Sequence, residues 1–368
     1  MKSYNNLWDS FISEDNLDMA IRNSSKGGKK KKRRDVRKAL SDIETFKKHI
    51  RYMINNYKPV HHKPKQIYDG VSRKKRTIIV PTYEEQVIQH MLVNVLKPMF
   101  LQGIYEYAYG SVPGRGSHDG KKAIEKWIRT DPKNCKYILK LDIKKYFESI
   151  PHDILKTKLA KYIKDKKVRE LLFAVIDSVP NNVGLPLGFY TSQWLAMWYL
   201  KDFDHFVKEY CYAPHYIRYM DDMVIMGSNK RKLWKTYDDI IHYIETLGLQ
   251  LNNRCQLFRF VYTVNGKDHG RDIDFMGFRF FRNRTIMRRC TYYKMLRKAR
   301  RIGAKQKPSI FELKQMMSYL GYIKSTDVYM VYLKYIKPFF DVKKAKRRIS
   351  NYDRRQNICG KPQKMAIA

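Results

Sequence analysis

Three aspartates stand at the ends of apolar segments and could do metal-assisted chemistry. Asp142 closes the segment Tyr137-Ile-Leu-Lys-Leu-Asp142, and the adjacent pair Asp221-Asp222 lies within Arg218-Tyr-Met-Asp-Asp-Met-Val-Ile-Met226. Carboxylates that neighbour each other in apolar surroundings resist burial unless cations compensate them. Two divalent ions held between Asp142 and Asp221 would supply that compensation.

Two such ions, about 3.5–4 Å apart, are the usual device for in-line nucleotidyl transfer. One activates the attacking hydroxyl and the other steadies the leaving pyrophosphate. Ligation by oxygen alone favours Mg²⁺ over softer metals, with Mn²⁺ as a substitute. The alternative is a surface turn in which two Asp residues are adjacent by chance. The apolar residues on both sides of the pair argue against it.

Strands and a hairpin must position these aspartates. Residues 137–143 have the apolar content of a buried strand, and 216–227 has the pattern of a hairpin with Asp221-Asp222 at its turn. Further strands are expected at 77–80 and 273–281. Apolar spacing predicts helices at 36–56, 84–101, 153–163, 192–207 and 234–247, a helix pair at 313–335 broken near Gly321, and mainly helix from 291 onward.

The net charge indicates which kind of partner the chain binds. The chain has 368 residues with 75 Lys+Arg and 35 Asp+Glu, a net charge of +40, and 43% hydrophobic residues exclude wholesale disorder. A polyanion would relieve the self-repulsion, so nucleic acid is favoured over an anionic membrane surface. No stretch reaches 18 apolar residues, the N-terminus lacks a signal-peptide pattern, and five scattered cysteines predict neither a disulfide framework nor a zinc site. We therefore expect a cytoplasmic protein.

Part of the charge is concentrated in two segments, 26–38 and 343–364, each with nine basic residues and one acid. A single run of this kind could be a solvated tail or a nuclear address. Two runs flanking a body with 28 Tyr and 17 Phe favour RNA or an RNA–DNA hybrid, because rings stack on bases while cations follow phosphates.

The segment Tyr219-Met-Asp-Asp222 matches the Y-x-D-D box of reverse transcriptases, and ordered matches extend from about residue 60 to 335. The chain resembles the bacterial and phage reverse transcriptases of the group II intron-like lineage. The other segments that carry the resemblance are Lys74-Lys-Arg-Thr-Ile-Ile-Val-Pro81, Gln86-Val-Ile-Gln-His90, Tyr107-Ala-Tyr-Gly-Ser-Val-Pro-Gly-Arg-Gly-Ser-His118, Asp142-Ile-Lys-Lys-Tyr-Phe147, Gly248-Leu-Gln-Leu-Asn252 and the primer-grip turn Phe275-Met-Gly-Phe278.

The resemblance implies an α+β fold of the right-hand polymerase type, with fingers, an antiparallel palm sheet and a helical thumb. It implies an RNA-directed DNA polymerase that binds an RNA template, the RNA–DNA hybrid and deoxynucleotides. The expected domains are a basic helical extension at 1–60, fingers at 61–140, a first palm part at 141–153, a connection at 154–190, a second palm part at 191–285, and the thumb with a basic tail at 286–368. The chain after residue 335 is too short for an RNase H domain or a Cys-rich endonuclease, so we expect neither.

The resemblance also implies roles for residues. Asp142 and Asp221 would ligate both Mg²⁺ ions, with Asp222 more peripheral and the carbonyl of Ile143 completing the shell. Phe147 would be the aromatic gate that crowds a ribose 2′-hydroxyl; its alternative is a plain core residue.

Three cations would bind the incoming triphosphate: Lys74, Lys75 and Arg76. Arg76 is the first choice because a guanidinium can grip phosphate oxygens in a bidentate way. The alternative for this run is a solvated turn.

One difference from the usual reverse transcriptase sequence indicates a narrower group within this lineage. In Leu185-Pro-Leu-Gly-Phe-Tyr-Thr-Ser-Gln193, Leu187 replaces a Gln and Gln193 replaces a Pro of the usual box. This form resembles diversity-generating retroelement reverse transcriptases, which copy RNA with errors at adenine and work with a small basic accessory protein. The alternatives are a defence-associated, abortive-infection reverse transcriptase and, from another class, a catalytically idle RNA-binding scaffold.

Overall fold

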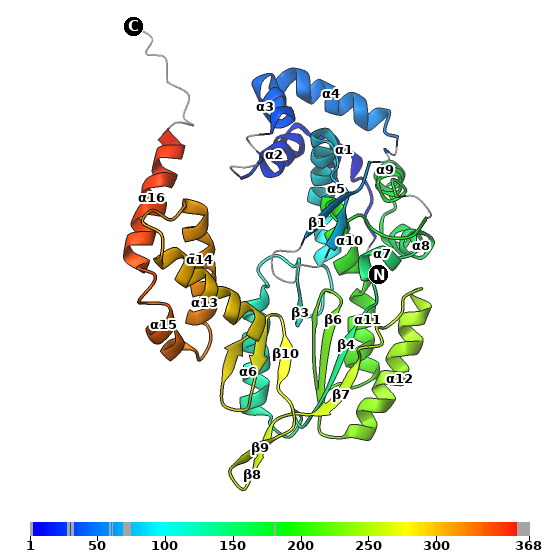
Figure 1. Cartoon of the computed structure of the whole chain (residues 1–368). Helices are drawn as coiled ribbons and strands as arrows, with labels where there is room; N and C mark the ends of the chain where they lie inside the picture. The colour runs from blue at the N-terminus through cyan, green and yellow to red at the C-terminus, as the bar shows by residue number, and fades with distance from the viewer. Residues whose placement is uncertain are drawn as a thin grey trace. The chain divides into compact units, whose positions relative to one another are not determined.

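The computed structural model describes residues 3–27, 30, 33–58, 60, 62–68, 75–179 and 182–358, with side chains described as far as residue 355. Lys74 therefore lies outside the described residues. The chain divides into two compact units, Met1–Ala123 with Asp131–Arg259, and Ile124–Thr130 with Phe260–Ala368 (Figure 1). None of the described helices is both long and apolar enough to cross a membrane.

Helix α5 (Tyr83–Leu101) is the centre of the helical part of the first unit. It begins with a capping box between Thr82 and Glu85, and its apolar residues lie on all sides. A helix that is apolar all round needs neighbours on every face. The helices that pack against it are α1 (Trp8–Ile12), α2 (Glu14–Ser24), α4 (Ile43–Asn55), α9 (Lys166–Ile176) and α10 (Tyr190–Tyr199).

The helix predicted over 36–56 is two helices, so that prediction is wrong in its continuity. Helix α3 (Arg34–Ser41) ends at Asp42, whose backbone leaves the helical region at φ −136°. The Asp42 carboxylate then accepts a hydrogen bond from the backbone N–H of Thr45 and caps α4. Asp competes in this way for backbone donors and favours a cap over a helix interior.

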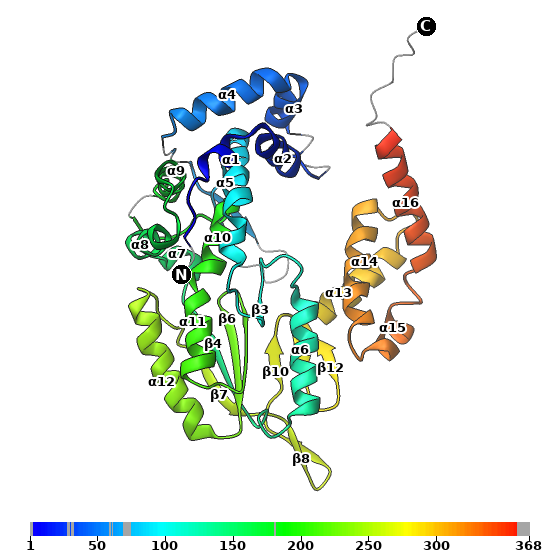
Figure 2. The same ribbon diagram turned by 180° about the vertical axis from the view of Figure 1, so that it is seen from behind.

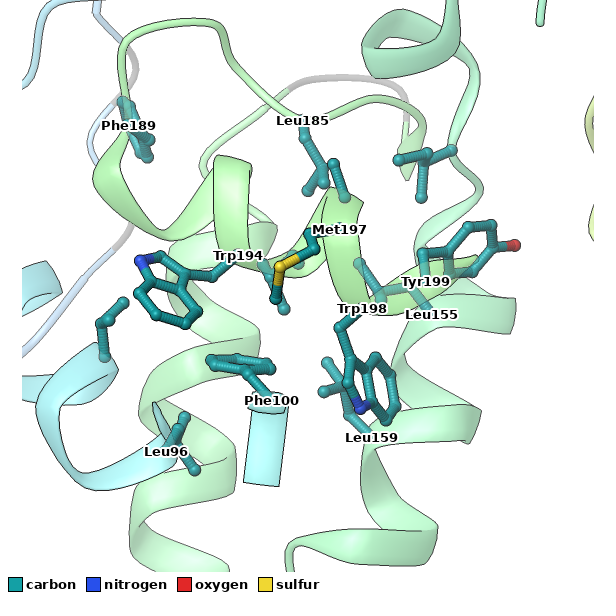
Figure 3. Close-up of a cluster of buried hydrophobic side chains, with 14 of the residues drawn as sticks. Leu96, Phe100, Leu155, Leu159, Leu185, Phe189, Trp194, Met197, Trp198 and Tyr199 are labelled. Carbon is teal, nitrogen blue, oxygen red and sulfur yellow. The ribbon is translucent and has the colours of Figure 1, made fainter. Parts of the chain in front are cut away.

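An aromatic core joins α10 to its neighbours. Figure 3 shows Trp194 and Trp198 of α10 near Phe100 of α5, with Trp198 also close to Leu159 of α8 (His152–Tyr162). The ring centroids of Phe100 and Trp194 are 5.9 Å apart, and those of Tyr162 and Trp198 are 5.3 Å apart.

The single helix predicted over 192–207 is divided in the structure: α10 is followed by α11 (Lys201–His205) and a π-helical turn, η3 (Phe206–Tyr210).

The five-stranded sheet of the first unit has the order β3-β5-β6-β4-β7. The strands β5 (His215–Tyr219), β6 (Asp222–Gly227), β4 (Tyr137–Asp142) and β7 (Gln256–Arg259) pair antiparallel, and the short β3 (Ala108–Tyr109) adds in parallel beside β5. Helix α12 (Lys230–Thr246) packs against β4, β6 and β7 (Figure 2). Beyond the sheet, this unit has the exposed hairpin β1 (Lys65–Tyr68) and β2 (Lys75–Ile78), and the short helix α7 (Tyr146–Ser149) after β4.

In its described residues, the second unit combines two small sheets with the helices α13 to α16 and the end of α6. Helix α6 (Ser117–Thr130) enters it with its last residues. The strands are the hairpin β8 (Tyr262–Val264) and β9 (Lys267–His269), and the sheet β10 (Ile273–Phe275), β11 (Phe278–Phe280) and β12 (Thr285–Met287). The helices are α13 (Arg289–Gly303), α14 (Ile310–Lys324), α15 (Tyr329–Tyr335) and α16 (Val342–Ile358).

Two predictions for this unit need correction. The single strand expected at 273–281 is a hairpin, because Met276 and Gly277 turn the chain with φ values of 51° and 87°. The break expected near Gly321 does not occur there: α14 continues to Lys324. It ends where the Thr326 hydroxyl and the Ser325 N–H both donate to the carbonyl of Tyr322.

Candidate active site

The sheet brings the three predicted aspartates together. Asp142, the last residue of β4, pairs with Asp222, the first residue of β6, and Tyr219 of β5 pairs with Asp222 from the other side. Asp221 therefore lies in the turn between β5 and β6. The N–H of Ile143 donates to the Asp221 carbonyl at 3.4 Å, which ties the turn to the end of β4.

The turn that carries Asp221 is held from the β3 side. Met220 has φ 56°, a left-handed conformation that is uncommon for a residue with a side chain. Its N–H donates to the carbonyl of Tyr109 at 3.1 Å. A Cβ on Gly110 would lie 2.8 Å from Cγ of Met220, so only glycine leaves room for this turn.

A buried ion pair stabilises the same turn. The guanidinium of Arg218 binds both carboxylate oxygens of Asp204, and these side chains are 1% and 0% exposed. A further N–H of Arg218 donates to the Met220 carbonyl at 3.0 Å, and Tyr216 donates its hydroxyl to Asp204 at 2.7 Å. A bidentate pair of this kind is stable only when its remaining hydrogen bonds are satisfied. Arg218 therefore fixes the carbonyl immediately before Asp221.

Asn252 orients the other catalytic candidate. Its side-chain amide donates to the Asp142 carboxylate at 3.0 Å, and its backbone N–H donates to the Asp142 carbonyl at 2.7 Å. Leu251, the preceding residue, forms an isolated bridge with Ile143. The segment Gly248–Asn252 is recognisable in the sequence, but this contact and the support of the turn by Arg218 and Asp204 were not predicted from it.

The pKa of Asp221 departs from that of an ordinary surface carboxylate. Burial, together with the charges of Asp142 and Asp222, raises the pKa of Asp221 from its ordinary value of 3.8 to about 6, and the Arg76 guanidinium acts in the opposite direction. Like charges in a partly desolvated site disfavour the ionised form. A bound cation would reverse that preference.

The donor set fits Mg²⁺ better than a metal that needs a complete protein cage. Among the described residues, no group of three or more His, Cys, Asp or Glu side chains stands ready to hold a metal ion. Mg²⁺ is usually bound by one or two carboxylates, with waters and substrate phosphates completing its shell. Asp142 supplies one of those two carboxylates from the end of β4, and Asp221 supplies the other from the turn between β5 and β6.

The predicted triphosphate cations lie on the hairpin β1–β2. Lys75 and Arg76 are exposed in β2, where they pair with Tyr68 and Ile67 of β1. Arg76 is close enough to Asp221 to affect its pKa. Arg76 thus lies near Asp221.

Phe147, the predicted gate, lies close to the start of the segment 185–193, which differs from the usual reverse transcriptase box. Phe147 lies half-buried on α7, and its carbonyl accepts from the N–H of Leu185 at 2.6 Å. The half-buried Leu187 is held through its carbonyl, which accepts from the N–H of Ile79 at 2.8 Å, and a Cβ on Gly188 would meet the Ile79 carbonyl at 2.1 Å. This loop is therefore fixed between α7 and the chain that follows β2. Gln193 is exposed on α10.

The raised pKa of Asp221 predicts a stability effect in protein stripped of metal. Between about pH 4 and 6 the folded state keeps a proton that the unfolded state releases, so the free energy of unfolding falls as pH rises through this window. Asp221→Asn removes that penalty and is expected to stabilise the protein at pH 7.5 by about 1–3 kcal/mol. At pH 4 the difference should vanish.

Urea unfolding in EDTA at the two pH values measures this effect, with Asp238→Asn, an exposed substitution on α12, as the matched control. An Asp221→Asn protein no more stable than wild type at pH 7.5 would show that Asp221 carries no such penalty.

One family model matches most of the chain. The model of the family described as reverse transcriptase (RNA-dependent DNA polymerase) matches residues 58–323. An uncharacterized 91 kDa protein in the cob intron of Schizosaccharomyces pombe is 29% identical over 150 residues, which cover 39% of this chain and 18% of that protein. The group II intron-encoded protein LtrA of Lactococcus lactis subsp. cremoris is 25% identical over 146 residues, 38% of this chain and 24% of its own length. The chain thus matches a minor part of these relatives.

A solved structure of telomerase from Candida albicans with a fragment of telomeric RNA covers 81% of this chain and 59% of its own, at 14% identity and a TM-score of 0.46.

Proposed function

Because the chain belongs to the reverse transcriptase (RNA-dependent DNA polymerase) family, we propose that it copies RNA into DNA, with Asp142 and Asp221 as its catalytic carboxylates. The predicted α+β right-hand polymerase fold is confirmed by the family match, the largely antiparallel sheet and the helical C-terminal unit. The observation that carries the proposal is the meeting of Asp142, Asp221 and Asp222 at the end of one sheet, where burial and the two neighbouring carboxylates raise the pKa of Asp221.

We assign each residue of the site a part in nucleotide addition. Bound Mg²⁺ would activate the primer 3′-hydroxyl and neutralise the leaving pyrophosphate. Asp142, oriented by Asn252, and Asp221, held by the turn, would present their carboxylates from fixed positions. Arg76 would bind a phosphate of the incoming nucleotide. Mn²⁺ is a chemically reasonable substitute because its preferred ligands are also oxygens.

The test is extension of an oligo(dT) primer on poly(rA) with dTTP and Mg²⁺, beside the same primer on poly(dA). We expect extension on the RNA template that stops when EDTA removes the metal and resumes when Mg²⁺ is restored. Extension on poly(dA) alone would contradict the assignment of the template.

We further propose that the enzyme is the error-prone polymerase of a diversity-generating retroelement. The support is Leu187, which stands in a rigid loop between α7 and the segment after β2 and offers apolar contact where the usual box has an amide. Apolar contact discriminates small changes of shape weakly, by roughly 1–3 kcal/mol. This assignment implies a small basic accessory protein as a partner.

Leu187→Gln is therefore expected to lower misincorporation opposite template adenine, by roughly 10-fold. Sequencing of cDNA made on an adenine-rich RNA measures the change, and Leu185→Met, a substitution in the same loop that keeps apolar contact, is the control. An unchanged error spectrum in the Leu187→Gln enzyme would contradict the role of Leu187.

A further inference from the structure

Helix α16 has two different faces. Its inner face packs on α14: Ala345 is buried, and Val342 and Ile349 pack against the core of the second unit. Asp353, the one acid of the helix, forms an ion pair with Lys314 of α14 at 2.7 Å. The helix is therefore anchored to the unit, and its one negative charge is compensated there.

The outer face carries cations, and the one acid of the helix, Asp353, lies at its edge in the ion pair with Lys314. Its exposed basic residues are Lys343, Lys344, Lys346, Arg347, Arg354 and Arg355. At 100° per residue, positions 343, 347 and 354 fall within a sector of about 40°, with 346 beside it. These cations form a stripe about 16 Å long at 1.5 Å rise per residue. We call these four residues the cationic stripe.

A groove lies beside the cationic stripe. It measures about 510 Å³ and is lined by Lys346 and Arg354 of the stripe, by the ion-paired Lys314 and Asp353, and by the apolar side chains of Met317 and Ile349. Cations for phosphates beside apolar surface for a base are the combination by which proteins hold RNA outside a regular helix. A membrane-binding helix would instead expose large apolar residues opposite its cations, but the opposite face of α16 is already packed on α14.

We propose that the cationic stripe and its groove bind the sugar–phosphate backbone of structured RNA, and that this contact adds affinity for the RNA rather than chemistry. Helix α16 lies outside the residues that match the family and belongs to a different unit from the aspartates. The proposal rests on the proposed function only in taking RNA as the partner. Such a contact would let the protein select an RNA by its shape, independently of the bases at the primer end.

The test uses the full chain with a fluorescent RNA hairpin that has a blocked 3′ end, in the absence of primer and nucleotides. The test variant is Lys346→Gln/Arg347→Gln/Arg354→Gln. The matched control, Lys230→Gln/Arg231→Gln/Lys235→Gln, removes the same charge from exposed positions of α12. We expect the stripe variant to lose roughly 10- to 100-fold in affinity and about 2–3 in the slope of log K against log salt, because each phosphate contact contributes about 0.7–0.9. The control should stay near wild type.

Three results would overturn the proposal: equal losses in both variants, unchanged hairpin binding in the stripe variant, or loss only of binding to vesicles containing phosphatidylserine. Extension of saturating, pre-annealed poly(rA)·oligo(dT) by the stripe variant should remain within about twofold of wild type, since the catalytic carboxylates are untouched. If wild type extends no primer while hairpin binding still depends on the cationic stripe, the proposed function fails and this inference stands.

Discussion

Asp221→Asn is expected to reduce DNA synthesis by roughly 10³-fold or more, which corresponds to about 4 kcal/mol of lost transition-state stabilisation. The substitution keeps the shape of the side chain and removes the charge that would hold Mg²⁺ beside Asp142. The turn should persist, because its contacts come from Tyr109, Arg218 and Ile143 rather than from the Asp221 carboxylate. The measurement is the rate of cDNA formation beside the affinity for RNA.

Affinity for RNA should stay within a few-fold of wild type in the Asp221→Asn protein, because cations and not this carboxylate bind phosphates. Asp238→Asn makes the same chemical change on the exposed side of α12 and should leave both quantities unchanged. Parallel loss of synthesis and RNA affinity in Asp221→Asn would indicate misfolding and would withdraw support from a catalytic role.

Phe147→Ala is expected to weaken discrimination against ribonucleotides by roughly 10- to 200-fold, the range that steric selection by one side chain supplies. The proposal that Phe147 is the gate draws support from its position on α7, directly after the Asp142 strand, and from the hydrogen bond that ties its carbonyl to the Leu185 loop. Removing the ring would open space for a 2′-hydroxyl without touching the carboxylates. The ratio of single additions of dTTP and UTP on poly(rA) measures the effect.

Phe206→Ala is the control, because Phe206 is also a half-buried aromatic of the first unit but stacks on Tyr210 and Tyr243 in the region of η3. A Phe147→Ala enzyme that still rejects UTP as wild type does would exclude Phe147 as the gate.

The parts of the site that the sequence predicted depend on local patterns. An apolar run ending in Asp142 forms β4, and the apolar segments on both sides of Asp221-Asp222 form β5 and β6. The meeting of the aspartates was anticipated from the need of such carboxylates for shared cations and from the resemblance to reverse transcriptases. Helix α5 was predicted nearly to the residue from its apolar content, and the structure adds the Thr82–Glu85 capping box at its start.

The supports of the site depend on contacts between distant residues, and a single sequence does not show them. Arg218 would be read as a surface cation, yet it is buried because Asp204, on α11, supplies a partner. The Asn252 contact to Asp142 joins residues more than a hundred positions apart. One available signal was missed: Arg218 stands among apolar residues of a predicted strand, where a buried cation needs an acidic partner.

The break of the 36–56 helix at Asp42 had a different cause. Apolar spacing continues across it and concealed the cap that the Asp side chain forms with Thr45.

The most direct test of the account is the product formed by the wild-type chain from a heteropolymeric RNA with an annealed DNA primer, four deoxynucleotides and Mg²⁺. The account predicts a primer lengthened into DNA whose sequence is complementary to the RNA. RNA that is bound while the primer stays at its original length, at every Mg²⁺ and Mn²⁺ concentration, would contradict it and would leave an RNA-binding scaffold.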